Sequence, residues 1–304
     1  MRVAILGTGA LGCVFAARLA ATAEVWMLGT WEEGLVAAKE AGVSVEEPDG
    51  NTRVERIFTS SGPGAVPPAD FALILVKSYQ TDRAAAWAAQ ILRSKGLVVT
   101  LQNGLDNGPR IAAAVGEDRL ALGVTYIGAT LLGPGRTRLV ANLATFVASH
   151  EATAARVSAF VSLLRGAGLE AQATTDIQGR LWGKAIANAA INPLTALWRV
   201  ANGDLLSGED RRKVMANLAQ EAVEVAHAVG VQPAIDDVVT FVEAVCRATA
   251  ANHSSMLQDV ERGRPTEIDS INGVIVGQGL RHGVPTPFNQ AVWLLVRGLH
   301  VTAG

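Results

Sequence analysis

Residues 2–12 read RVAILGTGALG, an apolar run of strand length followed at once by the pattern Gly-x-Gly-x-x-Gly. A run of this kind is typical of a strand that is covered on both faces. An Ala-rich helical pattern continues to about residue 21, and a second apolar run, EVWML, occupies residues 24–28. The order strand, helix, strand at this length predicts a βαβ unit.

The glycine pattern is a candidate phosphate-binding loop. Alone it is a weak signal, but here it follows a predicted strand and opens a helix, which is the context that supports it. The first two glycines allow a tight turn and close approach to a pyrophosphate, while Gly12 allows close helix packing. We therefore expect a dinucleotide on the helix N-terminus, bound by Gly7, Thr8, Gly9, Ala10, Leu11 and Gly12.

Three further apolar runs, at 71–76, 97–101 and 120–126, are separated by helical patterns. This alternation predicts a parallel sheet. Residues 44–56 indicate an excursion built on a Pro-Asp-Gly turn. The alternating pattern of 136–149 predicts antiparallel strands at the edge of the sheet.

The pattern changes after a last short strand, and the 304 residues suit two domains. We expect an α/β dinucleotide-binding domain over residues 1–174 and an all-helical substrate and catalytic domain over 175–304. Pro193 is expected to break or kink the first helix of the second domain. The segments with helical periodicity are 176–200, 211–229, 234–250, 254–262, 266–282 and 287–300.

Composition points to a small-molecule partner. A net charge of -2, with 49% hydrophobic and 18% charged residues, gives no general attraction to nucleic acid or to anionic membrane. No apolar run approaches the length of a membrane span, and no secretory signal is visible. Cys13 and Cys246 lack neighbours at metal-ligand spacing, so we expect no metal site, two core thiols and a cytoplasmic protein.

Thr30 occupies the position just after the second strand, where such folds read the ribose of the dinucleotide. An acid there favours NAD and a basic residue favours NADP, so Thr30 excludes neither. Thr30 with Glu33 also makes a Thr-x-x-Glu capping box, and we expect that capping role. Glu32 and Glu33 would repel a 2'-phosphate if they pointed at it.

Lys77 and Asn103 follow two predicted strands at their carboxyl ends, where open α/β sheets bind ligands. Each has an ordinary alternative. Lys77 would also serve as a solvated loop residue, and Asn103 before Gly104 as a turn residue.

Residues 181–197, LWGKAIANAAINPLTAL, place Lys184, Asn188 and Asn192 at every fourth position of an almost wholly apolar segment. This spacing puts the three side chains on one face of a helix. A Lys in such a segment needs partners, a cleft or a lowered pKa, each of which makes it a candidate proton donor. A single Lys that reaches out to solvent is the ordinary alternative, which three polar groups in register disfavour.

A second polar segment, at residues 252–273, contains Asn252, Ser255 and Glu267. Ser255 with Gln258 fits a helix cap, and Glu267 suits the first turn of a helix. Together with Lys184, the same residues would supply the hydroxyl, amide and carboxylate groups of a site.

These motifs resemble the ketopantoate reductases (2-dehydropantoate 2-reductases), a family of the 6-phosphogluconate-dehydrogenase-like group. The resemblance covers nearly the whole chain and implies a Rossmann domain followed by an all-helical domain, with NADP as the cofactor and NAD as the alternative. The motifs that carry it are GTGALG, VKSYQT, LQNG, GVTYIGA with GPGR, WGKAIANAAINPLTAL and NHSSMLQDVERGRPTEIDSING.

By this resemblance, Lys184 is the proton donor to the C2 ketone, and Glu267 is the carboxylate that interacts with it and with the substrate hydroxyl. Asn103 bridges nicotinamide and substrate, and Lys77 lies at the cofactor. The residues expected to hold the substrate are Asn188, Asn192, Asn252 and Ser255. Thr30 departs from the family, because many members carry an Arg there that contacts the 2'-phosphate.

The sequence therefore predicts reduction of 2-dehydropantoate to (R)-pantoate, a step of pantothenate and coenzyme A synthesis. The first alternative is an NAD-dependent D-2-hydroxyacid dehydrogenase acting on another branched or aromatic 2-oxo acid. A non-catalytic dinucleotide-binding sensor is the alternative of another class. The expected partner is a small 2-oxo acid, without nucleic acid or membrane, and a homodimer is allowed.

Overall fold

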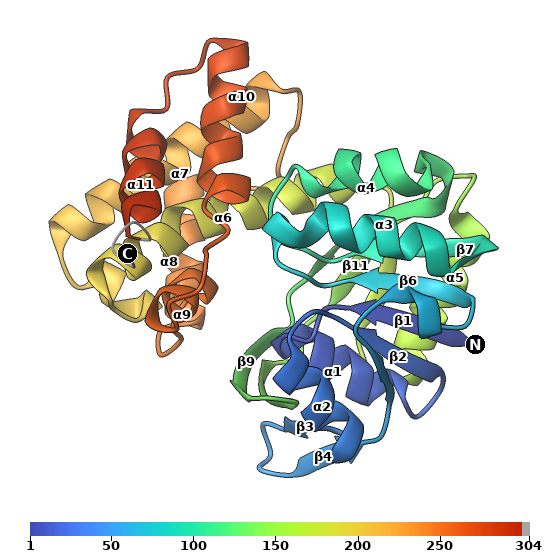
Figure 1. Cartoon of the computed structure of the whole chain (residues 1–304). Helices are drawn as coiled ribbons and strands as arrows, with labels where there is room; N and C mark the ends of the chain where they lie inside the picture. Colours follow the sequence, from blue (N-terminus) through green and yellow to red (C-terminus); the bar gives the residue numbers. More distant parts are fainter. Residues whose placement is uncertain (300–304) are drawn as a thin grey trace. The chain divides into compact units, whose positions relative to one another are not determined.

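The computed structural model describes residues 1–299, which divide into two units (Figure 1). The first unit comprises Met1–Gln102 and Asn107–Ile177, and the second comprises Asn103–Asp106 and the chain from Gln178 onward. The predicted boundary, residue 174, is the last residue of strand β12 and lies three residues before Ile177, where the first unit ends. The functions assigned to the two parts remain predictions.

An eight-stranded sheet forms the centre of the first unit, in the order β12-β11-β8-β7-β6-β1-β2-β5. Neighbouring strands from β5 to β8 run parallel, which confirms the predicted parallel sheet. β11 is antiparallel to β8 and parallel to β12. The strands are β1 (Arg2–Leu6), β2 (Glu24–Leu28), β5 (Phe58–Ser60), β6 (Ala69–Ile74), β7 (Leu92–Thr100), β8 (Leu120–Thr125), β11 (Thr145–Ala148) and β12 (Ala171–Thr174).

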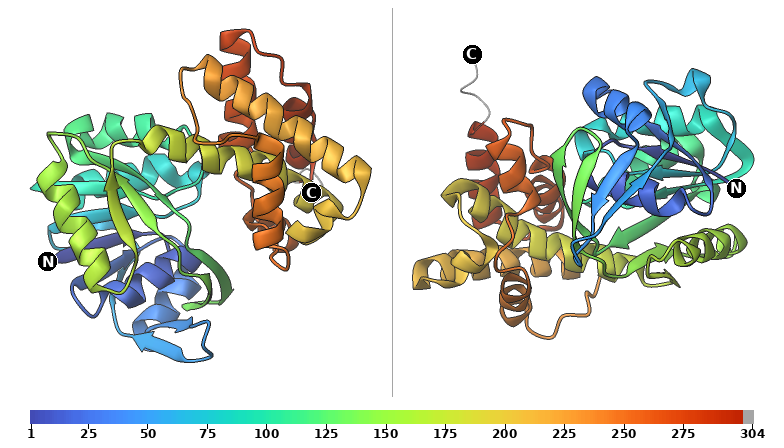
Figure 2. Two further views of the ribbon diagram at one scale, coloured as in Figure 1. Left: turned by 180° about the vertical axis from the view of Figure 1, so that it is seen from behind. Right: turned by 90° about the horizontal axis from the view of Figure 1, so that it is seen from below.

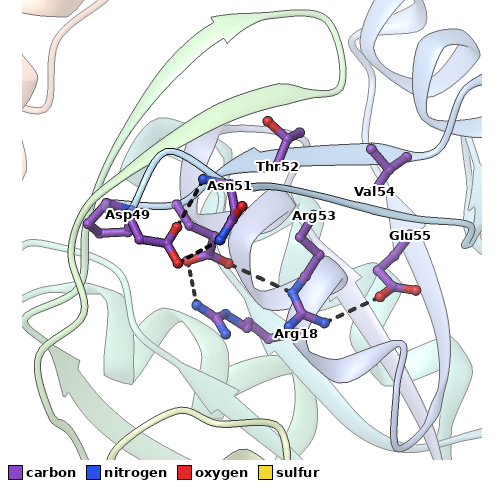
Figure 3. A pocket seen from close by; sticks show the side chains of 9 residues that line it. Arg18, Asp49, Asn51, Thr52, Arg53, Val54 and Glu55 are labelled. Carbon is purple, nitrogen blue, oxygen red and sulfur yellow. Dashed lines mark hydrogen bonds and ion pairs between the residues drawn. The ribbon is translucent and has the colours of Figure 1, made fainter.

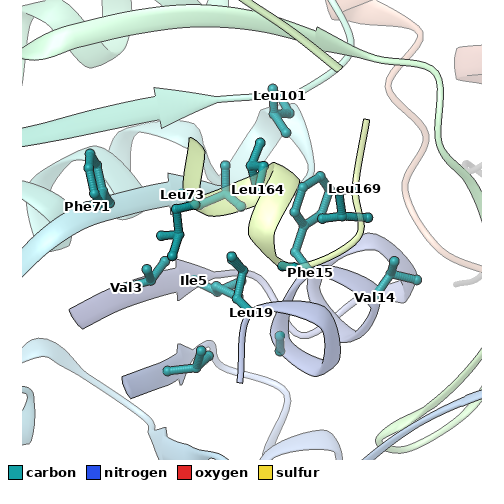
Figure 4. Packing of buried hydrophobic residues seen from close by; sticks show 14 of the residues in the cluster. Val3, Ile5, Val14, Phe15, Leu19, Phe71, Leu73, Leu101, Leu164 and Leu169 are labelled. Carbon is teal, nitrogen blue, oxygen red and sulfur yellow. The ribbon is translucent and has the colours of Figure 1, made fainter. Parts of the chain in front are cut away.

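Helices cover both faces of this sheet. Successive side chains of each strand point to opposite faces, so an apolar strand presents apolar side chains on both faces, and both need cover. On one face, Val3 and Ile5 of β1 pack against Phe15 of α1 (Ala10–Leu19) and Leu164 of α5 (Ala154–Gly166) (Figure 4). On the other face, Leu6 packs with α3 (Thr81–Ile91) and α4 (Asn107–Val115). Figure 2 shows α5, in yellow-green, across the sheet from α3 and α4. The apolar run at 2–6 is therefore covered on both sides, as predicted.

A second, four-stranded sheet has the order β4-β3-β10-β9. The excursion predicted for 44–56 is an antiparallel hairpin of β3 (Val43–Glu46) and β4 (Thr52–Glu55). The prediction for 136–149 is correct only in part: β11 joins the main sheet, but β10 (Arg136–Ala141) pairs with β9 (Gly128–Gly133) and β3 in the smaller one. The Glu46 carboxylate, which accepts from Arg138 at 2.9 Å, adds a side-chain contact between β3 and β10.

The remaining elements of the first unit are one α-helix and three short 3-10 helices. They are α2 (Glu32–Glu40), η1 (Pro63–Ala65), η2 (Ser78–Gln80) and η3 (Glu117–Arg119).

All regular secondary structure in the described part of the second unit is helical, and the six predicted helical segments are all found. It has its own apolar core, centred on α6 and α7. Residue 300, the predicted end of the last helix, lies outside the described residues. The elements are α6 (Ile177–Trp198), η4 (Asn202–Leu206), α7 (Glu209–Ala228), α8 (Val238–Ala248), α9 (Ser255–Glu261), the π-helical turn η5 (Asp269–Gly273), α10 (Val274–His282) and α11 (Pro287–Gly298).

The break predicted at Pro193 is wrong, because α6 continues through it to Trp198. A proline inside a helix has no N–H for the carbonyl four residues earlier, here that of Ala189. The buried Asn272 side chain supplies the missing donor, with Nδ2 at 3.0 Å from the Ala189 oxygen. A hydrogen bond from outside the helix therefore offsets part of the stability that α6 loses through Pro193.

Candidate active site

The glycine loop between β1 and α1 is built from two very close backbone approaches. Gly7 has φ 137°, a conformation that favours glycine, and a Cβ there would lie 2.8 Å from the Leu75 carbonyl carbon. A Cβ on Gly12 would lie 2.1 Å from the Gly7 oxygen. Both positions therefore exclude any larger residue, which confirms the packing role expected for Gly12.

Gly9 differs from Gly7 and Gly12, because no other part of the chain comes within 4 Å of the position that its Cβ would take. Gly9 caps α1 without a side-chain hydrogen bond to the first turn. The first N–H groups of a helix carry partial positive charge and bind anions. This open, donor-rich turn fits the pyrophosphate of a dinucleotide held by residues 7–12.

Lys77 and Thr30 lie at the same edge of the sheet as this loop, after β6 and β2 respectively. Lys77 is half-buried and Thr30 is exposed. The capping role expected for Thr30 is wrong: α2 begins at Glu32 after Trp31, and no side chain caps it. The Thr30 hydroxyl instead accepts a hydrogen bond from Arg83 Nη2 at 3.2 Å.

A buried hydrogen-bond network ties the ends of β6 and β7 to helices α3 and α4. Gln102 Nε2 donates to the Val76 carbonyl and to Thr81 Oγ1, each at 2.9 Å. Thr81 Oγ1 donates in turn to Asn107 Oδ1 at 2.8 Å. This network, which the sequence pattern LQNG did not predict, fixes the backbone directly before Asn103.

The polar stripe of α6 is present as predicted, with Lys184 and Asn188 half-buried and Asn192 buried. Burial lowers the pKa of Lys184 to about 8, and the negative charge of Glu267 acts in the opposite direction. Glu267 is itself only 6% exposed. It lies two residues before the start of the π-helical turn η5, a kind of irregularity that is frequent at functional sites.

Two hydrogen bonds hold residues 252–273 against α6. Thr195 Oγ1 donates to Ser254 Oγ at 2.7 Å, and Asn272 binds the Ala189 carbonyl. Ser254 is also the N-cap of α9, accepting from the Leu257 N–H at 3.1 Å, so the cap expected at Ser255 is wrong by one residue. Ser255 is exposed and therefore remains available as a substrate ligand.

The structure thus brings Lys184 and Glu267 within electrostatic reach of each other, and it places the other expected substrate residues in the same unit. Asn252 is half-buried, and its backbone carbonyl accepts from the Asn202 N–H at 3.0 Å. Asn103 opens the segment that groups with the helical unit, and Leu105 of that segment packs against the helical core.

A separate cavity of about 600 Å³ lies beside the β3–β4 hairpin, and Arg18 of α1 contributes to its wall (Figure 3). Both of its cations are paired: Arg18 binds Glu47 at 2.7 Å, and Arg53 lies 3.3 Å from Glu55 and 3.8 Å from Glu47. The cavity contains none of the residues expected at the active site.

Over residues 1–299, no helix is long and apolar enough to cross a membrane. The same residues contain no group of three or more His, Cys, Asp or Glu side chains arranged to hold a metal ion. Cys13 and Cys246 are both buried and reduced, as expected for core thiols.

Known proteins resemble this chain along its full length. The family model described as ketopantoate reductase PanE/ApbA matches residues 3–152, and the corresponding C-terminal model matches residues 176–300. The 2-dehydropantoate 2-reductase of Halobacterium salinarum is 35% identical over 299 residues, which cover 98% of each chain.

Solved structures agree with these sequence matches. A PanE/ApbA family ketopantoate reductase from Ralstonia eutropha JMP134 superposes with a TM-score of 0.90 at 32% identity, over 99% of this chain and 98% of that one. D-mandelate dehydrogenase with NADH and anilino(oxo)acetate has the same fold, with a TM-score of 0.93 at 24% identity over 99% and 98% of the two chains. Sequence and fold therefore agree that this chain belongs to the ketopantoate reductase family.

Proposed function

We propose that this protein reduces 2-dehydropantoate to (R)-pantoate with NADPH, using Lys184 as the proton donor. Full-length similarity to enzymes named for this reaction supports the substrate. The observation that carries the mechanism is a half-buried Lys184 whose pKa lies near 8 beside a buried Glu267.

Lys184 suits the protonation step on two grounds. When hydride reaches the C2 carbonyl, negative charge develops on its oxygen, and a cation held there stabilises that charge. An ammonium group with a pKa of about 8 is mostly protonated at neutral pH and gives up its proton more readily than an ordinary Lys. Glu267 keeps the group charged and directs it.

The remaining polar residues of the helical unit suit a 2-oxo acid. Asn188 follows Lys184 by one turn on the same face of α6, and Asn192 continues that face. We assign Asn252 and Ser255 to the substrate carboxylate and Asn103 to the junction of substrate and nicotinamide. Amide and hydroxyl donors bind a carboxylate without adding a second cation beside Lys184.

The bound dinucleotide supplies the hydride. Residues Gly7 to Gly12 would hold its pyrophosphate, Lys77 would lie beside it, and Thr30 marks the ribose position. A location in the cytoplasm and assembly as a homodimer remain predictions.

Replacement of Lys184 tests the mechanism. Lys184→Ala is expected to lower kcat for 2-dehydropantoate by about 10²- to 10⁴-fold, the usual contribution of a positioned acid, while the Kd of NADPH stays nearly unchanged. Lys213→Ala, at an exposed position of α7, is the matched control. A Lys184→Ala enzyme with near-normal kcat would refute the assignment.

A substrate panel tests the reaction itself. Under the proposal, kcat/KM is highest for 2-dehydropantoate among 2-dehydropantoate, 2-oxoisovalerate and phenylglyoxylate. A preference for phenylglyoxylate with NADH would indicate the D-2-hydroxyacid dehydrogenase instead. Cofactor binding with no oxidation of NADPH by any of the three would indicate the sensor.

A further inference from the structure

We infer that Arg83, in the first turn of α3, supplies the cation that recognises the 2'-phosphate of NADPH. This inference rests on the proposed function for its cofactor. Thr30 occupies the position after β2 that reads the ribose and brings no charge of its own. Arg83 is 53 residues away in sequence, yet its Nη2 donates to the Thr30 hydroxyl at 3.2 Å.

Two contacts position the guanidinium group. Besides the hydrogen bond to Thr30, its central carbon lies 5.8 Å from the centre of the Trp87 ring, one turn further along α3. Arg83 and Thr30 are both exposed. A guanidinium carries five N–H donors, more than the Thr30 oxygen can accept, so this exposed group retains donors for a phosphate.

The acid next to Arg83 in the sequence is paired with another cation. Asp82, the preceding residue, is bound by Arg110, with Nε–Oδ1 at 2.8 Å and Nη2–Oδ2 at 2.9 Å. The same hydrogen bonds lower the pKa of Asp82, so its charge is matched by Arg110. Glu32 and Glu33, in the first turn of α2, are exposed.

The large side chain beside Thr30 turns back onto its own helix. A Cβ on Gly34 would lie 2.4 Å from a carbon of the Trp31 ring, so this ring covers Gly34. Thr30 and Arg83 therefore provide a hydroxyl and a cation at the ribose position. A phosphate accepts hydrogen bonds from both, and Arg binds phosphate in a two-pronged manner.

Direct binding measurements test this assignment without turnover. Isothermal titration calorimetry on the full-length protein would compare NADPH with NADH, and adenosine 2',5'-bisphosphate with 5'-AMP. Arg83→Ala is expected to raise the Kd of the two 2'-phosphorylated ligands by about 10- to 100-fold, the loss of a hydrogen bond to a charged group. The other two ligands should change by less than about twofold, within the scatter of such single changes.

Two further variants serve as controls. Arg83→Lys keeps the charge and should retain part of the preference for the 2'-phosphate. Lys95→Ala removes one positive charge at an exposed position near the amino end of β7, away from the carboxyl edge, and should change nothing.

Three results would overturn the inference. The first is an equal loss of affinity for NADH and NADPH in Arg83→Ala, which would place Arg83 against the adenine. The second is no loss of affinity for either cofactor in that variant. The third is a wild-type protein that binds NADH as tightly as NADPH. If the wild-type protein reduces 2-dehydropantoate but Arg83→Ala binds NADPH as tightly as the wild type, this inference is refuted and the proposed function is not. Selective loss of 2'-phosphate binding in a protein without turnover refutes the proposed function alone.

Discussion

Lys184 combines burial with a nearby carboxylate, and the balance of the two effects predicts a pH dependence. Its pKa of about 8 lies well below that of an ordinary Lys because burial outweighs the charge of Glu267. Reduction requires the protonated form, so kcat/KM for the 2-oxo acid should be level below pH 8 and fall about tenfold per pH unit above it. The measurement is a pH profile of initial rates, with Lys213→Ala as the control. A profile that stays level to pH 10 would exclude Lys184 as the donor.

Glu267 should determine the pH at which kcat/KM begins to fall. Its charge raises the pKa of Lys184, so Glu267→Gln should move the falling limb to lower pH. A merely structural role would reduce the rate without moving the limb. Glu261→Gln, an exposed carboxylate 3.1 Å from His253, is the matched control and should leave the limb in place.

Gly9 and Gly12 allow folding and binding to be separated. Ala normally stabilises a helix interior by about 1 kcal/mol over Gly, but at Gly12 its Cβ would lie 2.1 Å from the Gly7 oxygen. We expect this overlap to dominate, so Gly12→Ala should cost about 1–3 kcal/mol and lower Tm. Gly9→Ala meets open space and should keep Tm while raising the Kd of NADPH. Thermal unfolding and cofactor titration of both variants check this, and a wild-type Tm for Gly12→Ala would contradict it.

At the scale of elements, α6 depends on a contact that its own sequence does not contain. Asn272 binds the Ala189 carbonyl that Pro193 leaves without an N–H donor, and Asn289 Oδ1 accepts from the same Nδ2 at 2.9 Å. Asn289 in turn donates to Glu221 of α7 at 2.8 Å. This buried network links the four elements α6, η5, α11 and α7, so it should stabilise the helix that carries Lys184.

A double-mutant cycle tests the link between Pro193 and Asn272. Asn272→Ala should lower the free energy of unfolding by about 1–3 kcal/mol, because the Ala189 carbonyl loses its partner. In a Pro193→Ala background the helix has its own donor, and the cost should fall by about 1 kcal/mol. Urea unfolding of the four proteins gives the coupling. Strictly additive effects would mean that Asn272 acts only through Asn289.

Local patterns predicted most elements correctly and the caps poorly. The apolar runs and helical periodicity gave the parallel sheet and six helical segments, because burial on one or two faces imposes those periods. Thr30 and Ser255 both fit cap motifs, but neither is a cap in the structure. Thr30 accepts a hydrogen bond from Arg83, and the N-cap of α9 is Ser254. A cap motif describes only residues that are close in sequence. The contacts of Thr195 with Ser254 and of Arg83 with Thr30 come from other elements, so the motif does not report them.

At the scale of the whole molecule, sequence spacing reports which side chains share a face of one helix, but it does not report the contacts between elements. The stripe of α6 follows from its spacing, and the roles of its side chains follow from family resemblance. Gln102 and Arg83 were missed because their partners depend on which strands and helices become neighbours, and no local pattern reports that. The packing role of Gly12 was predicted correctly because the atom that it approaches, the Gly7 oxygen, lies within the same βαβ unit.

The two units have separate apolar cores with no shared buried residue, which predicts where cofactor binding stabilises the chain. A ligand that binds the folded state at 100 times its Kd adds about 2.7 kcal/mol against opening. NADPH should therefore slow hydrogen exchange in β1, α1 and the start of α3, while α7 and α8, within the helical core, exchange as before. Exchange of the full chain with and without NADPH, followed by mass spectrometry, measures this. Equal protection of α7 and α8 would show that both cores open as one cooperative unit, since only then does a ligand on the first stabilise the second.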